Sequence, residues 1–301
     1  SGDVLAASGR GFSGGDRGGG QRLRNDRPSV WRVSSPSSGT IGPNCCAAQC
    51  LMDVRSIVFL HGFLGSALDF QPIANRLSSS IESICLDLPG HGRSIALPAE
   101  TYRFVGAAEF VLKNVASLSR PFPRPALYGY SMGGRLALYL ALHHPDRFSH
   151  VFIESASPGL DIELDRVDRQ LRDAKLAAHL QADFPAFLDS WYRTELFQTL
   201  RHHPSFPEIF SRRRNNHPIE LARALQGMSI ASQPSLWDQL KTATVPIDLI
   251  VGTQDPKFLA LNQKMSRLCP TSTLNPIAGV GHNVHAEDPA SIDRLIKLRL
   301  S

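Results

Sequence analysis

Short apolar runs alternate with longer amphipathic segments along most of the chain, from residue 56 onward. Between these runs, apolar residues recur at helical spacing over residues 69–77, 104–118, 132–143, 258–268 and 289–298. The runs themselves are typical of buried parallel strands and cover residues 56–60, 83–88, 126–130, 150–155 and 246–252. This alternation predicts an α/β fold with a mostly parallel, doubly wound sheet that helices cover on both faces.

Two segments depart from that rhythm. Residues 157–240 are polar, arginine-rich and helical without strand signals, which predicts a helical cap inserted into a domain spanning residues 51–301. Residues 1–50 hold ten of the 23 glycines and few spaced apolar residues, so we interpret them as a low-complexity linker or a transit-like disordered segment. Because the chain begins with Ser1 rather than Met, we expect a fragment or a processed form.

Composition narrows the classes of function. No apolar run approaches the ~18 residues that a membrane span requires. The formal charge of +5 comes mostly from arginines in segments of mixed sign, which favours local anion sites over a nucleic-acid track. Five cysteines form no disulfide framework, which favours a reducing compartment. Cys45, Cys46 and Cys50 lack a second ligand pair at zinc spacing, so we expect no metal.

The run Gly129-Tyr130-Ser131-Met132-Gly133 carries the first chemical signal. It stands between the strand expected at residues 126–130 and the helix expected at residues 132–143. In such a turn the serine adopts a strained conformation, and the flanking glycines avoid a clash. The motif therefore predicts that Ser131 is the reactive serine of an α/β-hydrolase fold.

A reactive serine needs a base, and the base needs an orienting carboxylate. In this fold the partners follow in the order Asp or Glu, then His. Asp255 comes directly after the run at 246–252, and His282 lies in a glycine-bearing loop before the last helix. We expect these two residues to complete a triad; Asp248 and His285 are the weaker competitors.

A His-Gly pair in "FLHGFLGS" (59–66) follows the first predicted strand. Such a turn directs backbone N–H groups toward the reactive serine, so the N–H groups of Phe63 and Met132 are the expected oxyanion hole. The loop "DLPGHGRS" (87–94) is expected to shape the rim of the pocket, and His91 is given no catalytic role.

Arginines indicate the charge of the substrate. Arg135 follows Ser131 by four residues and so shares its helix face. The cap adds Arg166, Arg169 and Arg172 at three-residue spacing, then Arg212, Arg213 and Arg214. Interspersed carboxylates (Asp165, Asp168, Asp173) will neutralise some of these cations. The remainder predict a di- or tricarboxylate substrate held by guanidinium groups.

The motifs described above and several segments of the cap occur in one order along the chain. They are "VFLHGFLGS", "GYSMGGRLAL", "DRQLRDAKLA", "WYRTELF", "RRRNNHP", "ASQPSLW" and "GTQDPKF…GHNVHAEDP". Over residues 56–299 the chain resembles the MenH-type lyases, the 2-succinyl-6-hydroxy-2,4-cyclohexadiene-1-carboxylate synthases of menaquinone and phylloquinone biosynthesis. The resemblance implies that pyruvate is eliminated from 2-succinyl-5-enolpyruvyl-6-hydroxy-3-cyclohexene-1-carboxylate, a small polycarboxylate, with no cofactor.

The resemblance also implies roles for individual residues. Ser131, activated by His282, would be the base, Asp255 would orient His282, and the amides of Phe63 and Met132 would hold the enolate-like oxygen. Arg135, Arg169 and Arg213 would hold carboxylates, and Tyr130, Trp191 and Lys257 would line the pocket. In plant-type phylloquinone biosynthesis this lyase resembles the last segment of a multifunctional chain, which leaves open a fusion to upstream enzymes and a location in plastid or cytoplasm.

The chain departs from the family at its start, where only "SVWRV" (29–33) stands for the one or two strands expected before residue 56. Two other readings stay open. A serine carboxylesterase or carbon–carbon-bond hydrolase acting on an acidic substrate would use the same triad through an acyl-enzyme. A non-catalytic binding domain of this fold is the third reading, although such domains usually lack a triad member.

Overall fold

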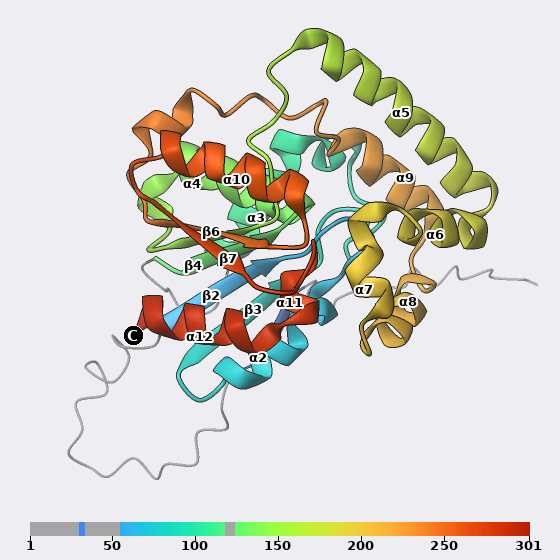
Figure 1. Cartoon of the computed structure of the whole chain (residues 1–301). Coiled ribbons are helices and arrows are strands. Elements are labelled where there is room, and N and C mark those ends of the chain that lie inside the picture. Colours follow the sequence, from blue (N-terminus) through green and yellow to red (C-terminus); the bar gives the residue numbers. More distant parts are fainter. Residues whose placement is uncertain (1–29, 34–54, 118–123) are drawn as a thin grey trace, which may run out of the picture.

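The computed structural model of the chain describes residues 30–33, 55–117 and 124–301. Within them, one seven-stranded sheet has the order β1-β3-β2-β4-β5-β6-β7 (Figure 1). Its strands are β1 (Val30–Val33), β2 (Arg55–Leu60), β3 (Ile81–Leu86), β4 (Ala126–Tyr130), β5 (Val151–Glu154), β6 (Ile247–Gly252) and β7 (Ser272–Ile277). Strands β2 to β7 are parallel, and β1 pairs antiparallel with β3. The predicted α/β class with a mostly parallel sheet is confirmed.

Both faces of the sheet are covered, which explains the continuous apolar runs of its strands. In β2, Val58 and Leu60 face the core beneath α3 (Phe104–Ala116), α4 (Met132–His143) and α10 (Pro256–Leu268). Ile57 and Phe59 face the opposite core, beneath α2 (Gln71–Leu77) and α12 (Pro289–Leu300). The alternation follows from the two-residue side-chain period of a strand. Figure 1 shows the two helical layers above and below the sheet.

The ends of several elements differ from the sequence-based bounds. Strand β3 begins at Ile81 and ends at Leu86, two residues earlier than expected at each end, because its pairing with β2 sets its register from Arg55↔Ile81 onward. A 3₁₀ turn (Ala67–Phe70) precedes α2, so the helix expected at residues 69–77 begins at Gln71. These shifts leave the order of elements unchanged.

The short strand β1 lies inside the segment that composition assigned to a low-complexity linker. It pairs from Val30↔Leu86 to Val33↔Ser83, so that its backbone groups hydrogen-bond to the outer edge of β3. Pairing at a sheet edge does not require the amphipathic spacing on which the sequence interpretation depended. The rest of residues 1–50 lies outside the described residues.

Between β5 and β6 the chain forms a group of helices with an apolar core of their own. Leu180, Phe187, Leu200, Ile209 and Leu221 are buried in that core. The helices are α5 (Glu163–Ala182), α6 (Phe184–Tyr192), α7 (Gln198–His202), α8 (Phe206–Arg213) and α9 (Pro218–Gly227). They occupy the segment for which the sequence indicated a cap, and Figure 1 shows them beyond the carboxyl ends of the strands. Among the described residues, no helix combines the length and apolarity needed to cross a bilayer.

Candidate active site

Ser131 occupies a sharp turn between β4 and α4. Its φ of 50° and ψ of −106° lie in a region that L-residues rarely adopt. A Cβ at Gly129 would lie 2.4 Å from the carbonyl oxygen of Gly133, and one at Gly133 would lie 2.3 Å from that of Leu60. Both glycines are therefore required for the close approach of strand and helix. The turn exposes the Ser131 hydroxyl to the cavity beneath the cap.

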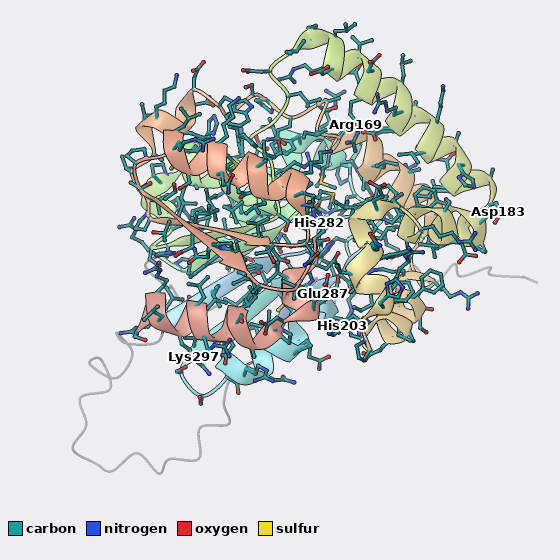
Figure 2. The ribbon with its side chains drawn as sticks, viewed as in Figure 1. Arg169, Asp183, His203, His282, Glu287 and Lys297 are labelled. Atoms are coloured by element: carbon teal, nitrogen blue, oxygen red, sulfur yellow. The ribbon has the colours of Figure 1, made fainter. Side chains whose placement is uncertain are left out.

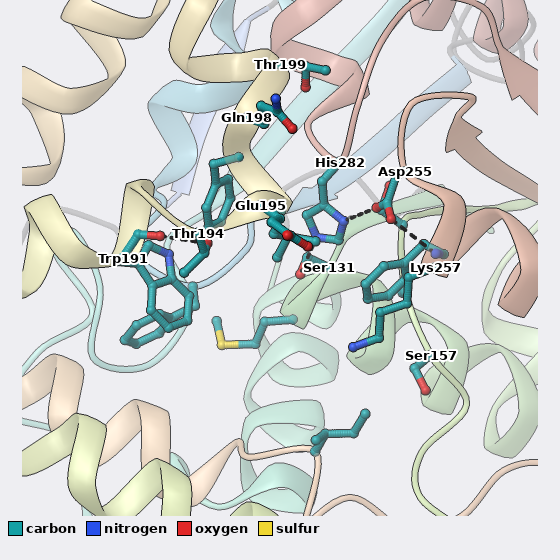
Figure 3. A pocket seen from close by; sticks show the side chains of 18 of the residues that line it. Ser131, Ser157, Trp191, Thr194, Glu195, Gln198, Thr199, Asp255, Lys257 and His282 are labelled. Carbon is teal, nitrogen blue, oxygen red and sulfur yellow. Dashed lines mark hydrogen bonds and ion pairs between the residues drawn. The ribbon is translucent and has the colours of Figure 1, made fainter.

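Three side chains form a hydrogen-bonded chain at this turn (Figure 3). The Nε2 atom of His282 lies 3.3 Å from the Oγ atom of Ser131, and its Nδ1 atom lies 2.7 Å from the Oδ2 atom of Asp255. Asp255 also caps α10, since its Oδ1 atom accepts the N–H of Phe258 at 3.1 Å. Only 1% of His282 and 6% of Asp255 is exposed. The arrangement can take a proton from the serine and stabilise the resulting imidazolium.

The competing residues lie elsewhere. His285 is bound through Nδ1 to the buried carboxylate of Glu154, 2.9 Å from Oε1, and Glu154 also accepts the hydroxyl of Tyr128 at 2.5 Å. Asp248, near the amino end of β6, accepts hydrogen bonds from Arg299 and lies 2.6 Å from a ring nitrogen of His150. The structure therefore brings Asp255 and His282 to Ser131 and leaves these two in structural contacts.

The two residues expected to supply the N–H groups of an oxyanion hole lie near Ser131. Met132 is the first residue of α4, and the first N–H groups of a helix have no partner within it. Phe63 follows Gly62, where a Cβ would lie 3.5 Å from that of Ser131 and 2.5 Å from the ring of Tyr130. Phe63 and Met132 both line the cavity.

Two buried histidines hold the loops around the oxyanion region. His61 accepts the N–H of Leu88 at 2.9 Å through Nε2, and His91 accepts the N–H of Leu64 at 3.2 Å through Nε2. Burial lowers the pKa of His61 to about 4 and that of His91 to about 3, so both rings are neutral at pH 7. Their role in cross-linking residues 59–66 to residues 87–94 was not apparent from the sequence.

A cavity of about 1200 Å³ lies between the cap and the carboxyl ends of the strands. Its wall includes all three triad residues, together with Phe63, Met132, Arg135, Arg169, Arg172, Trp191 and Lys257. Figure 2 shows Arg169 on the inner side of α5, across from His282. The cavity thus brings Ser131 together with several cationic side chains.

Arg135 extends from α4 into this cavity. Its guanidinium donates to the carbonyl of Met228 at 2.7 Å and to the side-chain oxygen of Gln233 at 3.2 Å. Burial, and then the positive charge of Arg169, lower the pKa of Arg135 to about 9, which leaves it charged at neutral pH. No carboxylate neutralises it directly in the contacts of the described residues, so an anionic ligand is its natural counterion.

The arginine stripe on α5 divides into two kinds of residue. Arg169 and Arg172 line the cavity, and Arg169 contacts Asp173 through Nε at 2.8 Å. Arg166 instead donates to the backbone carbonyls of Leu160, Ala231 and Gln233. Arg166 therefore holds the segment that carries the Gln233 partner of Arg135.

Arg213 does not reach the cavity. Its Nη1 and Nη2 atoms each lie 2.8 Å from an oxygen of Asp69, and its Nε atom donates to the Tyr192 hydroxyl at 3.1 Å. Burial alone would raise the pKa of Asp69, but the charge and hydrogen bonds of Arg213 outweigh it and lower the pKa to about 2. The structure therefore does not bring Arg213 to the cavity with Arg135 and Arg169, and its role in holding a substrate carboxylate stays a prediction.

Of the other residues expected to line the pocket, Trp191 and Lys257 do so and Tyr130 does not. The half-buried indole of Trp191 lines the cavity beside Phe63, and its buried N–H has no hydrogen-bond partner among the described residues. Lys257 extends into the cavity (Figure 3). Tyr130 lies behind the wall, where its ring packs against those of His282 and His285 at centroid distances of 5.4 and 4.5 Å. Tyr130 thus supports the histidine loop, and the sequence-based expectation that it lines the pocket is corrected.

Residues that the sequence did not single out also line the cavity. Ser155 follows β5 with a φ of 48°, and its buried hydroxyl has no hydrogen-bond partner within the described part of the chain. Thr199 on α7 and Glu287 on α11 (Val284–Glu287) lie on the side nearest His282. Only strain or long-range contacts mark these residues, and neither produces a sequence motif. Among the described residues, no group of three or more His, Cys, Asp or Glu side chains is placed to hold a metal ion.

Residues 55–289 match the model of the α/β hydrolase fold family, and the strained serine turn and ordered triad agree with it. The chain belongs to the α/β-hydrolase fold family. Relatives within that family carry one recurring name. Over 237 residues the chain is 31% identical to the 2-succinyl-6-hydroxy-2,4-cyclohexadiene-1-carboxylate synthase of Salmonella arizonae, covering 78% of this chain and 90% of that protein. A Bacillus subtilis protein that carries the same synthase name provisionally is 35% identical over 264 residues, covering 85% and 90%.

Two further comparisons extend this result. The chain is 32% identical over 255 residues to Protein PHYLLO, chloroplastic, of Arabidopsis thaliana, which covers 78% of this chain but only 15% of that longer protein. The solved structure of MenH from S. aureus superposes with a TM-score of 0.78 at 29% identity, covering 90% of this chain and 97% of that one. These matches place the chain with the MenH-type members of the family.

Proposed function

We propose that this protein is the lyase that converts 2-succinyl-5-enolpyruvyl-6-hydroxy-3-cyclohexene-1-carboxylate to 2-succinyl-6-hydroxy-2,4-cyclohexadiene-1-carboxylate and pyruvate. The observation that carries the proposal is the presence of a Ser131–His282–Asp255 chain and of Arg135 and Arg169 in one cavity. The relatives named for this synthase, at 31% and 35% identity, support it.

The triad supplies the base. His282 accepts the proton of the Ser131 hydroxyl, and Ser131 then removes the proton beside the succinyl carbonyl of the substrate. The electron pair left on carbon forms an enolate, whose oxygen the N–H groups of Phe63 and Met132 would stabilise. When the enolate collapses, the ring gains a double bond and the carbon–oxygen bond to the enolpyruvyl group breaks. The departing enolpyruvate takes up a proton to become pyruvate.

The cations orient the substrate over this base. Arg135 and Arg169 belong to α4 and α5, so together they connect the sheet domain to the cap. Carboxylates held between them would fix the ring relative to Ser131, since guanidinium–carboxylate contacts are directional. Lys257, on another wall of the cavity, is a third candidate partner for the polycarboxylate.

The match to a small part of the plant protein supports a second, coarser proposal about partners. The region shared with PHYLLO is a MenH-type segment within a much longer chain. We infer that this domain acts alongside upstream enzymes of the same pathway, by fusion or by association.

The test is release of pyruvate from the enolpyruvyl substrate, generated in situ by the preceding synthase. Wild-type protein is compared with Ser131→Ala and with a blank, because the substrate can eliminate unaided. Release accelerated by the wild type and lost in Ser131→Ala is the expected result. If a folded protein that is labelled at Ser131 matches the blank, the lyase proposal fails, and hydrolysis of an acidic ester or diketone becomes the reaction to test.

A further inference from the structure

A carboxylate that the reaction does not use ties the cap to the loop of His282. Glu287 lies at the end of α11, five residues after His282, and its side chain reaches back toward that loop (Figure 2). Its Oε2 atom accepts the N–H of Gly281 at 3.0 Å, and its Oε1 atom accepts the hydroxyl of Thr199 at 3.1 Å. Thr199 belongs to α7, so a single side chain bridges the cap and the residue before His282.

The cap helix also touches this loop directly. A Cβ at Gly281 would lie 2.0 Å from Oγ1 of Thr199, and the rings of Phe197 and His282 meet edge to face at a centroid distance of 6.2 Å. On its other side the loop lies against the end of β6, where a Cβ at Gly252 would lie 2.2 Å from the carbonyl oxygen of Gly281. Figure 3 shows Thr199 and Gln198 over His282.

The bridge adds to the hydrogen bonds that hold this loop to the segment after β6, in which the N–H of Gln254 donates to the carbonyl of Val280 at 2.9 Å and the N–H of Gly279 donates to the Thr253 hydroxyl at 3.0 Å. The loop contains Gly279, with a φ of 77°, and Gly281, and glycine backbones have more accessible conformations than other residues. The distance of 3.3 Å between His282 and Ser131 is already at the long end for a hydrogen bond, so a small outward shift of the loop breaks the contact. Asp255 fixes only the Nδ1 side of the ring.

We propose that Glu287 and Thr199 are positioning residues, which hold His282 within reach of Ser131 through a hydrogen-bonded bridge from α7 to Gly281. Neither residue transfers a proton. The bridge acts on the activation of the serine, and so does not depend on which reaction that serine serves.

The experiment measures the rate at which a small neutral fluorophosphonate labels Ser131, since only an activated serine reacts. Thr199→Val keeps the shape of the side chain and removes the hydroxyl; Glu287→Ala removes both acceptors. We expect each to slow labelling ~10-fold, the order expected for a small displacement of a catalytic group. The double variant should be no slower than Glu287→Ala alone, because both changes break one bridge.

Conservative variants separate positioning from charge and from stability. Thr199→Ser keeps the hydroxyl, and Glu287→Gln can accept from Gly281 and donate to Thr199, so both should stay within about twofold of wild type. Thr242→Val, at an exposed hydroxyl that donates only to the carbonyl of Gln239 among its observed contacts, is the control. Melting temperatures are recorded for every variant.

Wild-type labelling by Thr199→Val overturns the proposal, as does a Glu287→Gln variant as slow as Glu287→Ala. If Glu287→Ala does not fold, the comparison of Thr199→Val with Thr199→Ser decides alone. If the wild-type protein is labelled at Ser131 but releases no pyruvate, the proposed lyase is refuted. The positioning proposal is then decided by the labelling rates of the variants alone.

Discussion

Asp69 and Arg213 form a buried two-point ion pair, with both nitrogen–oxygen distances at 2.8 Å. Asp69 belongs to the 3₁₀ turn after β2, and Arg213 ends α8 of the cap. The pair therefore fastens the cap to the sheet domain at a point that does not line the cavity. A cap arginine that sequence motifs associate with substrate binding has a structural role here.

Substitution of Arg213 by Gln should destabilise the protein by about 3–5 kcal/mol, because it leaves Asp69 buried without its cation. Urea denaturation measures the loss. Lys241→Gln, in an exposed pair with Asp238, is the control and should leave the midpoint unchanged. An Arg213→Gln variant of wild-type stability but raised KM would instead mean that this guanidinium binds substrate.

Substitution of Arg135 by Gln should raise KM for the polycarboxylate about 10- to 100-fold, because a charged hydrogen bond contributes about 1.5–3 kcal/mol. Steady-state kinetics at varied substrate concentration gives the value. Arg193→Gln changes an exposed cap arginine and should leave KM alone. Equal effects in the two variants would mean that general electrostatics, rather than a local contact, governs binding.

Substitution of Asp255 by Asn should lower kcat by about 10³- to 10⁴-fold, as expected when the base loses the carboxylate that sets its tautomer. Asp248→Asn is a sharp comparison, because that residue is also buried but contacts Arg299 and His150. The second variant should lose stability and keep its kcat once folded. A similar fall in kcat for both would remove the distinction between the two aspartates.

Acid should destabilise the protein through His61 and His91. Their folded-state pKa values, about 4 and about 3, lie below the unfolded value of about 6.5, so the unfolded chain binds protons first as the pH falls. The stabilisation is complete above pH 6.5 and declines toward pH 3, by about 1.4 kcal/mol per pH unit for each such histidine. Urea midpoints between pH 7 and pH 4 measure this slope.

The matched variants for this pH dependence are His91→Gln and His143→Gln. Gln retains an acceptor for the N–H of Leu64 without the titrating ring, so the slope should flatten in His91→Gln. His143 is exposed on α4, and its replacement should leave the slope unchanged. An unaltered slope in His91→Gln would assign the acid sensitivity to other groups.

Local patterns were sufficient to predict much of this structure. The strand, turn and helix around Ser131 follow from contiguous residues, since the glycines at 129 and 133 and the flanking apolar runs encode their own geometry. The order of Asp255 and His282 after that turn follows from the fold. Strand register, by contrast, depends on a partner strand, which is why β3 begins two residues before its apolar run suggested.

The destinations of long charged side chains could not be predicted in the same way. Arg213 and Asp69 are 144 residues apart in the chain, and Thr199 and Glu287 are 88 apart. Spacing showed that Arg166, Arg169 and Arg172 share a stripe, but only the packing of the loop at 231–233 shows that Arg166 turns away from the cavity. Such choices depend on three-dimensional neighbours, which one sequence does not encode locally.

The closeness of Arg135 and Arg169 has a thermodynamic consequence. The lowered pKa of Arg135 reflects first its burial and then its repulsion by Arg169, which the carboxylate of Asp173 partly offsets. An anion that enters relieves the repulsion, so part of its binding free energy comes from strain already present in the protein. Small carboxylates, including released pyruvate, should therefore raise the melting temperature and compete with substrate, which makes the enzyme responsive to its own product.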